Sequence, residues 1–414
     1  MPSPRRPRLH TLCKAPAPGR GPALLLLCGS MACADWGAEC GQGQESLDLH
    51  AGLGDFLYQD GVILDLDLGV EPTELATLPL DWREDQEDVH AWLDVLGEQH
   101  EAGLRLKGER SFRPIDKKAS IKLDLHQWDH DASLYGVRRL TLNNMIQDPT
   151  MLAEHVGYRL YQALGLVAPR QGYACVSVDG EPRGLYSVVE TMDEQFLDRA
   201  FEDDSGNLYE GGHGADLRPG RVTLFQLQDQ GVPEDWADLE VLLAALENSS
   251  PDTLMDTLAR HFDLDSLMLG MAASLYLGSI DSYITRANNF LLYHAPGNGK
   301  WTLIPWGLDQ ALLQALDPHD PYDPEALAEH GRIFEDCLAS QACVAALDEA
   351  LLQVADEAEA MGLAQWADQE CARIAALSRQ DPGAEVGPWT TRRKQRDAVK
   401  LLRERPDQLR EWLQ

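Results

Sequence analysis

The sequence predicts an α+β fold with two lobes: a small, β-rich N-lobe with one key helix and a larger, mostly helical C-lobe. The chain has 414 residues, which is enough for two lobes around a substantial core. Segments with strand periodicity gather between residues 51 and 192, whereas helical patterns dominate 193–414. The hydrophobic share of 44% and charged share of 25% are ordinary for a globular protein.

The charge balance is far from neutral, with 68 acidic against 35 basic residues and a net charge of −33. Such a surface repels nucleic acid and anionic membranes, so we expect no nucleic-acid partner. The acidic residues are scattered along the chain, which indicates a solvated acidic surface rather than a binding tail. Any site for a phosphate ligand must then be a local island of positive charge.

The N-terminal segment, residues 1–34, has the pattern of a secretory signal peptide. Basic residues precede a short apolar run at 23–27, and Ala32-Cys33-Ala34 offers a cleavage site between small residues. A lipoprotein signal with an acylated Cys33 is the alternative. The run is too short for a permanent membrane span, and no later segment is apolar enough. We therefore expect an exported chain, secreted or in the cell envelope, with a linker at 35–50.

Eight cysteines are present, and Cys337 and Cys343 lie close together in a helical stretch. An exported chain permits a disulfide between them. Buried thiols are the alternative, and the sequence does not choose between the two or assign a partner to Cys371. The spacings match no standard zinc motif.

The N-lobe, residues 51–192, shows strand patterns, one helix and a hairpin. Asp148 is the predicted cap of the helix and Gly165 its end, because Asp favours helix starts and Gly favours helix ends. Asp179-Gly180 is a typical two-residue hairpin turn. The predicted strands are 57–68, 104–108, 119–125, 173–178 and 185–190.

The C-lobe, residues 193–414, contains an apolar helix at 266–277, which Asp265 is expected to cap, and a hairpin within 281–310. The helix leads directly to Asp281, and Asp309 follows the hairpin 28 residues later. Asn288 and Asn289 stand at the start of the hairpin. Phosphoryl transfer uses one carboxylate near the attacking hydroxyl, and an amide plus a second carboxylate to hold the metal ion. The spacing therefore predicts a metal-binding hairpin.

Several blocks, in order between about residues 104 and 310, resemble the spore-coat protein H (CotH) kinase family. Those blocks are Arg105-Leu106-Lys107-Gly108, Lys118-Ala119-Ser120-Ile121-Lys122-Leu123, Leu142-Asn143-Asn144, Asp148-Pro149-Thr150, Leu164-Gly165-Leu166-Val167-Ala168-Pro169-Arg170, Gly184-Leu185-Tyr186, Gly206-Asn207-Leu208-Tyr209, Asn288-Asn289-Phe290-Leu291-Leu292-Tyr293 and Ile304-Pro305-Trp306-Gly307-Leu308-Asp309. The resemblance implies an atypical protein-kinase fold and an exported kinase. Such an enzyme transfers the γ-phosphate of ATP, with Mg²⁺ or Mn²⁺, to hydroxyl side chains of secreted or envelope proteins.

The resemblance gives the carboxylates and amides of the hairpin region defined roles. Asp281 is the candidate base that accepts or orients the substrate hydroxyl. Asn289, rather than Asn288, is the preferred metal ligand, because it shares the face of Leu291 and Tyr293. Asp309 is the metal carboxylate, and magnesium needs few protein ligands besides phosphates.

The N-lobe is expected to hold the nucleotide. A lysine just before the second of its strands can contact phosphates, and an acid on the helix can orient it. The set consists of Lys118 paired with Glu154, Lys122 as the rival lysine, Arg110 and Arg113 as the positive island, and Glu190 near the adenine. Each of these residues also has an ordinary structural explanation, such as a surface lysine or a first-turn glutamate that the helix dipole stabilises.

The chain departs from its relatives at Gly307, where many of them carry Asp. If that acid holds a metal ion in the family, this chain lacks one ligand. The alternative hypothesis is therefore an inactive envelope or coat module that keeps the kinase-like fold. A cluster of His126, Asp129 and His130 has loose metal-like spacing, and we interpret it as a polar loop.

Overall fold

The structure is a computed structural model that describes residues 36, 39–50, 52–84, 87–212, 214–228, 236–318 and 330–414. The predicted signal at 1–34, with Cys33, lies outside these residues. Residues 36–414 form one compact unit. The lobe boundaries drawn from the sequence therefore stay predictions, as does the linker.

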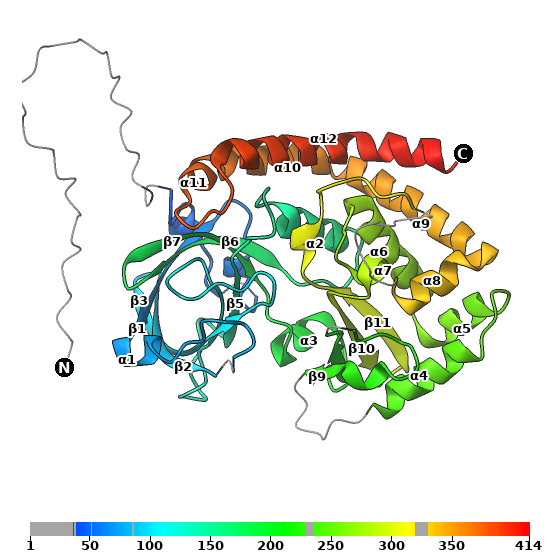
Figure 1. The fold of residues 1–414 in the computed structure, drawn as a ribbon, viewed down its shortest axis with the longest axis horizontal. Helices are drawn as coiled ribbons and strands as arrows, with labels where there is room; N and C mark the ends of the chain where they lie inside the picture. The colour runs from blue at the N-terminus through cyan, green and yellow to red at the C-terminus, as the bar shows by residue number, and fades with distance from the viewer. Residues whose placement is uncertain are drawn as a thin grey trace, which may run out of the picture. The chain divides into compact units, whose positions relative to one another are not determined.

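Seven strands of the described chain close into a barrel in the order β1-β2-β3-β4-β5-β7-β6 (Figure 1). Their bounds are β1 Ile63–Val70, β2 Val89–Val95, β3 Glu98–Lys107, β4 Ser120–Asp124, β5 Arg139–Asn143, β6 Gln171–Val178 and β7 Glu181–Val189. A parallel pairing of β1 with β6 closes the barrel, and the other neighbours are antiparallel. The sequence predicted a β-rich lobe but not this closure.

The barrel interior is filled by alternate residues of each strand, because successive side chains point to opposite faces. In β1, Leu64, Leu66 and Leu68 are fully buried, while Asp65 is exposed. Burial of each such leucine stabilises the fold by about 1.5–3 kcal/mol through the hydrophobic effect. The alternation of apolar and polar residues in the sequence thus belongs to a strand with one fully buried face.

Helix α2 (Ala153–Ala163) begins five residues after the Asp148 that was predicted to cap it. The carboxylate of Asp148 accepts hydrogen bonds from the main-chain N–H groups of Thr150 and Ala153, each at 2.8 Å. Asp148 therefore organises the turn that leads into α2 and still accepts its first N–H. Gly165, with φ +71°, follows the helix end as predicted. The β6–β7 hairpin turns at Asp179-Gly180, also as predicted.

A second, four-stranded sheet has the order β11-β10-β8-β9 within the described residues. Its strands are β8 Asn207–Glu210, β9 Gln226–Gln228, β10 Phe290–Ala295 and β11 Lys300–Pro305. Leu291 of β10 pairs with Ile304 on one side and with Glu210 on the other. The predicted hairpin is therefore confirmed, and its open end carries the candidate metal ligands.

The remaining described chain is mostly helical, and α6 at its centre is almost wholly buried. Asp263, not Asp265, caps α6, because its carboxylate accepts the N–H of Ser266 at 3.0 Å. The other helices are α1 Pro72–Leu75, α3 Glu194–Ala200, α4 Ala237–Glu247, α5 Leu254–His261, α6 Leu264–Leu277, α7 Tyr283–Arg286, α8 Arg332–Leu338, α9 Gln341–Ala360, α10 Leu363–Arg373, α11 Ala375–Gln380 and α12 Pro388–Trp412.

Disulfides join two pairs of cysteines in the described chain. Cys337–Cys343 links α8 to α9, which decides the alternative that the sequence left open. Cys40–Cys175 ties the segment before β1 to β6. No single described helix has both the length and the apolar composition of a membrane span, and α8 with α9 reaches them only as a pair bent by 106°.

Candidate active site

A cleft of about 880 Å³ brings together the ends of the barrel strands and the open end of the β10–β11 hairpin. Described residues on its walls include five acidic and five basic side chains. The acidic residues are Glu109, Glu154, Glu210, Asp281 and Asp309, and the basic ones are Lys107, Arg110, Lys122, Arg221 and Arg286. In a chain with a net charge of −33, this balance makes the cleft locally much more positive than the average surface.

Asp281 is held in one orientation by hydrogen bonds to both carboxylate oxygens. Asn288 Nδ2 donates to Oδ1 at 3.1 Å, and Gln310 Nε2 donates to Oδ2 at 2.8 Å. Arg286 Nη1 lies 4.0 Å from Oδ1. Gly278 ends α6 in a left-handed conformation and turns the chain toward Asp281. The predicted position of Asp281 just beyond a buried helix is therefore correct.

Asn289 meets the loop after β11 because of the hairpin register. Phe290 pairs with Pro305, and Trp306 N donates to the Asn289 carbonyl oxygen at 3.1 Å. The Asn289 side chain donates from Nδ2 to the Asp281 carbonyl oxygen at 2.7 Å. Gly307 has φ +54°, and a Cβ at this position would lie 2.8 Å from Asn289 Oδ1. Glycine thus allows the closest approach of the two chain segments.

Asp309 sits in a 3-10 turn, η5 (Leu308–Gln310), that packs directly on α2. A Cβ on Gly157 of α2 would come within 2.6 Å of Leu308 Cδ1, so glycine there allows the close approach without a shift of the leucine. Burial raises the pKa of the Asp309 carboxyl well above its usual range, and the negative charge of Glu154 raises it further. This crowding of acids favours a bound cation.

Lys107, at the end of β3, is the lysine that the structure places among these acids. Its Nζ donates to Asn143 Oδ1 at 2.6 Å, and Asn143 Nδ2 donates to Glu154 Oε1 at 2.9 Å. Burial lowers the pKa of Lys107 to about 8, although Glu154 and other acids oppose the shift. Glu154 is itself only 3% exposed, whereas the sequence pattern gave it no reason to be buried.

The predicted pairing of Lys118 with Glu154 is wrong. Lys118 Nζ donates to Asp381 Oδ2 at 2.7 Å, and both side chains are almost completely buried. Asp381 also accepts the main-chain N–H of Leu185 at 3.0 Å. Lys118 therefore fastens the loop before α12 to the barrel and lines a separate cavity of about 300 Å³. A charged side chain so deeply buried needs such a partner.

Two further residues, which were predicted to contact the nucleotide, form ion pairs with other residues instead. Arg113 donates from Nη2 to Glu385 at 2.6 Å and lines the Lys118 cavity. Glu190 accepts from Arg170 and from Arg199, each at 2.6 Å, so its charge is neutralised outside the cleft. In contrast, Arg110 and Lys122 do line the cleft.

The sequence reasoning missed several residues of the cleft, among them Lys107, Asn143 and Gln310. Lys107 and Asn143 close β3 and β5, which both border β4 in the barrel. Both residues belong to the blocks that resemble the family. The available signal was that each is a polar residue at the end of a strand. The pairing order of the strands was the missing information.

The donor set suits Mg²⁺ or Mn²⁺, since Asn289, Asn288 and Asp309 line one cleft and carry amide and carboxylate oxygens. The described residues contain no group of three His, Cys, Asp or Glu side chains arranged for a metal ion. Zinc-type coordination is built from such groups, whereas magnesium takes one or two carboxylates and completes its shell with phosphate and water oxygens.

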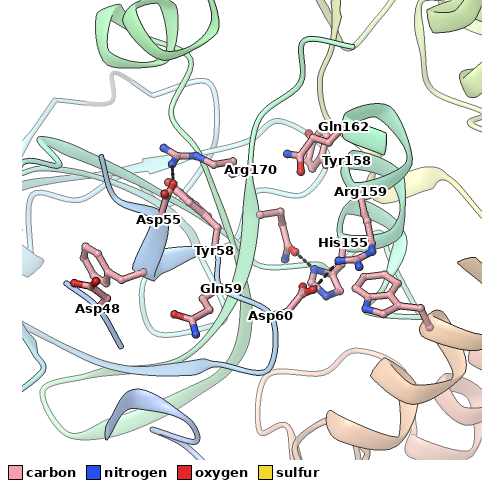
Figure 2. Close-up of a pocket in the computed structure, with 13 residues that line it drawn as sticks. Asp48, Asp55, Tyr58, Gln59, Asp60, His155, Tyr158, Arg159, Gln162 and Arg170 are labelled. Atoms are coloured by element: carbon pink, nitrogen blue, oxygen red, sulfur yellow. Dashed lines mark hydrogen bonds and ion pairs between the residues drawn. The ribbon is translucent and has the colours of Figure 1, made fainter. Parts of the chain in front are cut away.

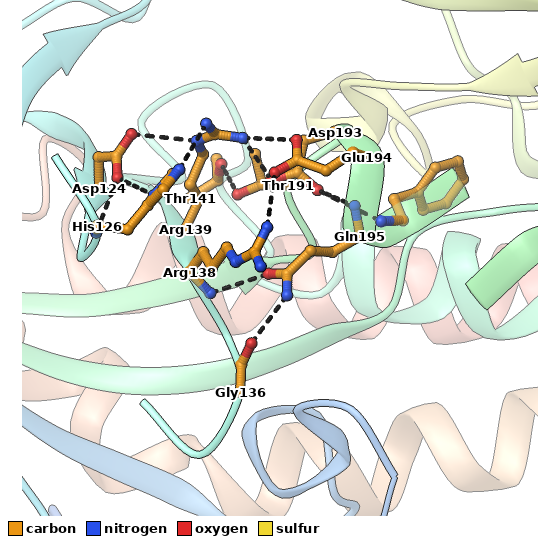
Figure 3. Close-up of polar contacts among 11 residues, drawn as sticks. Asp124, His126, Gly136, Arg138, Arg139, Thr141, Thr191, Asp193, Glu194 and Gln195 are labelled. Atoms are coloured by element: carbon orange, nitrogen blue, oxygen red, sulfur yellow. Dashed lines mark hydrogen bonds and ion pairs between the residues drawn. The ribbon is translucent and has the colours of Figure 1, made fainter. Parts of the chain in front are cut away.

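His126, one member of the predicted cluster, belongs to an ion-pair network (Figure 3). Arg139 stands at its centre and donates to Asp124 at 3.1 Å and to Glu194 at 2.8 Å. His126 Nε2 lies 3.2 Å from Arg139 Nη2. Because Asp193 of the same network caps α3, these contacts join the barrel to the start of the C-terminal half. The interpretation of this segment as a polar loop is confirmed.

A smaller cavity of about 310 Å³ borders another face of α2 (Figure 2). His155, Arg159 and Gln162 share that face, because residues three and four apart on a helix are neighbours. His155 Nε2 lies 3.1 Å from Glu370 of α10, and Arg159 donates to Asp60 at 2.7 Å. These contacts position α2, and with it Glu154, between the cleft and α10.

Two of the solved structures to which this chain is similar share low sequence identity with it. The Helicobacter pylori proinflammatory kinase CtkA aligns over 81% of this chain and 93% of its own, with 12% identity and a TM-score of 0.35. The Shewanella oneidensis toxin–antitoxin complex of HipA, HipB and operator DNA aligns over 85% of this chain and 76% of its own, with 13% identity and a TM-score of 0.34.

Sequence comparison is more specific. Inner spore coat protein H of Bacillus subtilis is 24% identical over 254 residues, or 58% of this chain and 67% of that protein. An inner spore coat protein H-like protein of the same organism is 29% identical over 102 residues, which cover 21% of this chain and 32% of that protein. The CotH kinase protein family model matches residues 104–413. The resemblance is thereby confirmed, and the chain belongs to the CotH kinase protein family.

Proposed function

We propose that this protein is an exported kinase that transfers the γ-phosphate of ATP to hydroxyl side chains of secreted or envelope proteins. The observation that carries the proposal is the convergence of Lys107, Asp281, Asn289 and Asp309 on one cleft. Export is supported by the N-terminal signal pattern and by two disulfides, which persist in oxidising compartments.

In this proposal Lys107 takes the role first given to Lys118. Its ammonium projects into the cleft and is oriented by Asn143, which links it to Glu154 on α2. Arg110 and Lys122 add positive charge on the same side. Together these cations neutralise the triphosphate and orient it toward the hairpin.

Asn289 and Asp309 would hold the divalent cation, with Asn288 adjacent. A bound cation neutralises charge that develops on the phosphoryl oxygens during transfer. The residues themselves contribute position: the contact with the Asp281 carbonyl fixes the Asn289 amide, and packing on α2 fixes the Asp309 turn. Their geometry is therefore set before the nucleotide arrives, which lowers the cost of ordering the site.

Asp281 would orient the acceptor hydroxyl and accept its proton. Both carboxylate oxygens already have amide partners, so the side chain cannot rotate freely. The carboxylate is thereby held in a fixed position from which it can accept a hydrogen bond from the substrate hydroxyl.

A non-catalytic envelope or coat module is the second candidate, and Gly307 is the observation that favours it. If an acid at this position serves as a metal ligand in other family members, this chain lacks that ligand. In this chain the glycine allows close packing against Asn289 instead. Magnesium needs few protein ligands besides phosphate and water oxygens, so Asn289 and Asp309 alone are sufficient. We therefore prefer the active enzyme.

Transfer of labelled phosphate tests the proposal directly. The purified chain is incubated with γ-labelled ATP and Mg²⁺ or Mn²⁺, alone and with envelope proteins, beside Asp281→Asn and Asp309→Asn. Asp256→Asn is the matched control, because it makes the same change at an exposed position on α5. We expect transfer by the wild type and the control only. Transfer that survives both site substitutions would refute the site, and absence of ATP binding would establish the non-catalytic module.

A further inference from the structure

The C-terminal helix α12 has a charge opposite to that of the chain as a whole. Its 25 residues carry eight lysines and arginines against four acidic residues, whereas the whole chain has 35 against 68. α12 packs on α9, α10 and α11 (Figure 1). None of its residues lines the cleft. Neither the proposed chemistry nor the nucleotide site accounts for this concentration of positive charge.

The exposed basic residues follow one face of the helix. Arg392, Arg396, Lys400 and Arg403 recur at intervals of four, four and three residues, which places them in a row. Trp389 precedes them by three residues and is 83% exposed. We call these five residues the basic stripe. Arg393, also exposed, lies at its edge.

The basic stripe has no structural task in the described chain. The opposite face of α12 supplies the packing, with Ala398, Leu402 and Leu409 buried. Lys400 lies 3.8 Å from Glu404, and this exposed pair contributes little. The three arginines of the stripe have no ion-pair or hydrogen-bond partner among the described residues.

We propose that the basic stripe docks the protein onto an anionic phospholipid membrane. A rigid row of cations about 17 Å long, at about 1.5 Å per residue, matches a flat array of negative headgroups. Each lysine or arginine near such a surface contributes about 1 kcal/mol. Trp389 at the end of the row is the side chain that favours the membrane–water interface. The apolar face of α12 stays in the protein core, so the contact is electrostatic and reversible.

The net charge of −33 does not prevent this contact. At physiological salt, charges more than about 8 Å from the membrane are largely screened, so the residues nearest the surface decide the interaction. The N-terminal segment of the chain is itself basic and does not complement the stripe. If Cys33 is acylated, a basic patch supplies the second contact that a single acyl chain needs for stable anchoring.

Sedimentation with lipid vesicles tests the proposal. The full chain is mixed with vesicles of phosphatidylcholine alone or of phosphatidylcholine with phosphatidylglycerol, and the bound fraction is measured. The test variant is R392E/R396E. The control is K117E/R260E, which changes the net charge equally at exposed positions outside the stripe. Circular dichroism of each variant checks that the fold is retained. W389A tests the aromatic contact separately.

We expect binding only to vesicles that contain phosphatidylglycerol, and its loss in high salt. R392E/R396E should weaken this binding at least about tenfold, since two reversed charges each remove about 1 kcal/mol or more. The control should bind like the wild type. Equal binding to neutral vesicles, or equal weakening by both variants, overturns the proposal. So does a stripe-dependent association with a second copy or with duplex DNA in the absence of vesicle binding.

Discussion

Lys107 and Glu154 are joined through one amide: Asn143 accepts a hydrogen bond from the Lys107 ammonium at 2.6 Å and donates one to the Glu154 carboxylate at 2.9 Å. β3, β5 and α2 each supply one of these residues. The relay therefore couples the position of α2 to the orientation of the cleft lysine. Movement of the helix would reorient the ammonium without breaking a direct ion pair.

Removal of the relay should weaken nucleotide binding without unfolding the protein. Asn143→Leu keeps the volume but removes both hydrogen bonds. We expect the Kd for ATP to rise about tenfold, since a hydrogen bond to a charged group contributes about 1.5–3 kcal/mol. Titration calorimetry measures this change, with Asn248→Leu at an exposed position as the control. An unchanged Kd would show that Asn143 does not orient Lys107 for ATP.

Lys107 and Lys118 should respond in opposite ways to the same substitution. Lys118→Met leaves Asp381 buried without its partner and should lower the free energy of unfolding by about 3–5 kcal/mol. Lys107→Met should abolish ATP binding with little loss of stability. Denaturant unfolding and calorimetry separate the two effects. Lys118→Met with Asp381→Leu should recover much of the stability. Loss of ATP binding in a folded Lys118→Met protein would restore the original assignment.

Asp309→Asn should stabilise the metal-free protein while it abolishes binding of Mn²⁺. Burial and the negative charge of Glu154 raise the pKa of Asp309, so its ionised form destabilises the fold. Its unfavourable contribution appears as pH rises above the usual carboxyl range and through the raised pKa. Neutral Asn removes a penalty on the order of 1 kcal/mol. Melting temperature and Mn²⁺ relaxation measure both effects, and a destabilised variant would contradict this account.

ATP binding should weaken as pH rises through about 8, the pKa to which burial lowers Lys107. Below this pH the ammonium is charged, and above it the free protein loses the cation that meets the phosphates. The unfolded chain keeps this proton up to about 10.5, so the same group makes stability rise with pH between the two values. Calorimetry on either side of pH 8 gives the profile. Lys107→Arg should flatten it, because arginine stays charged.

Gly307→Ala should weaken metal binding more than it lowers stability. The new Cβ would lie 2.8 Å from Asn289 Oδ1 and displace the amide. The left-handed φ of +54° adds a cost of about 1–2 kcal/mol for a residue with a side chain. Mn²⁺ titration and thermal unfolding distinguish the two effects. Gly362→Ala, at a similar φ of +64° with open space around the Cβ, is the matched control.

Local patterns in the sequence were sufficient for much of the fold. The alternation in β1, the turn at Asp179-Gly180 and the end of α2 at Gly165 each depend on neighbouring residues, and the structure agrees. The β10–β11 hairpin is likewise a local element, which is why Asn289 and Asp309 could be placed together. The start of α6 was less exact, since Asp263 and Asp265 both qualify as a cap. The start of α2 was less exact because a turn separates Asp148 from the helix.

By itself, the sequence determined the family, the hairpin and the grouping of Asp281, Asn289 and Asp309. Only the tertiary structure decided which lysine joins them. Lys107 and Lys118 are both lysines beside strands, and local periodicity cannot distinguish them. The pairing of β3 and β5 with β4 brings Lys107 to Asn143, which contacts Glu154. Lys118 instead binds Asp381, in the loop before α12 and over 260 residues away. The role of a buried charged side chain depends on its partner, and that partner comes from a distant part of the chain.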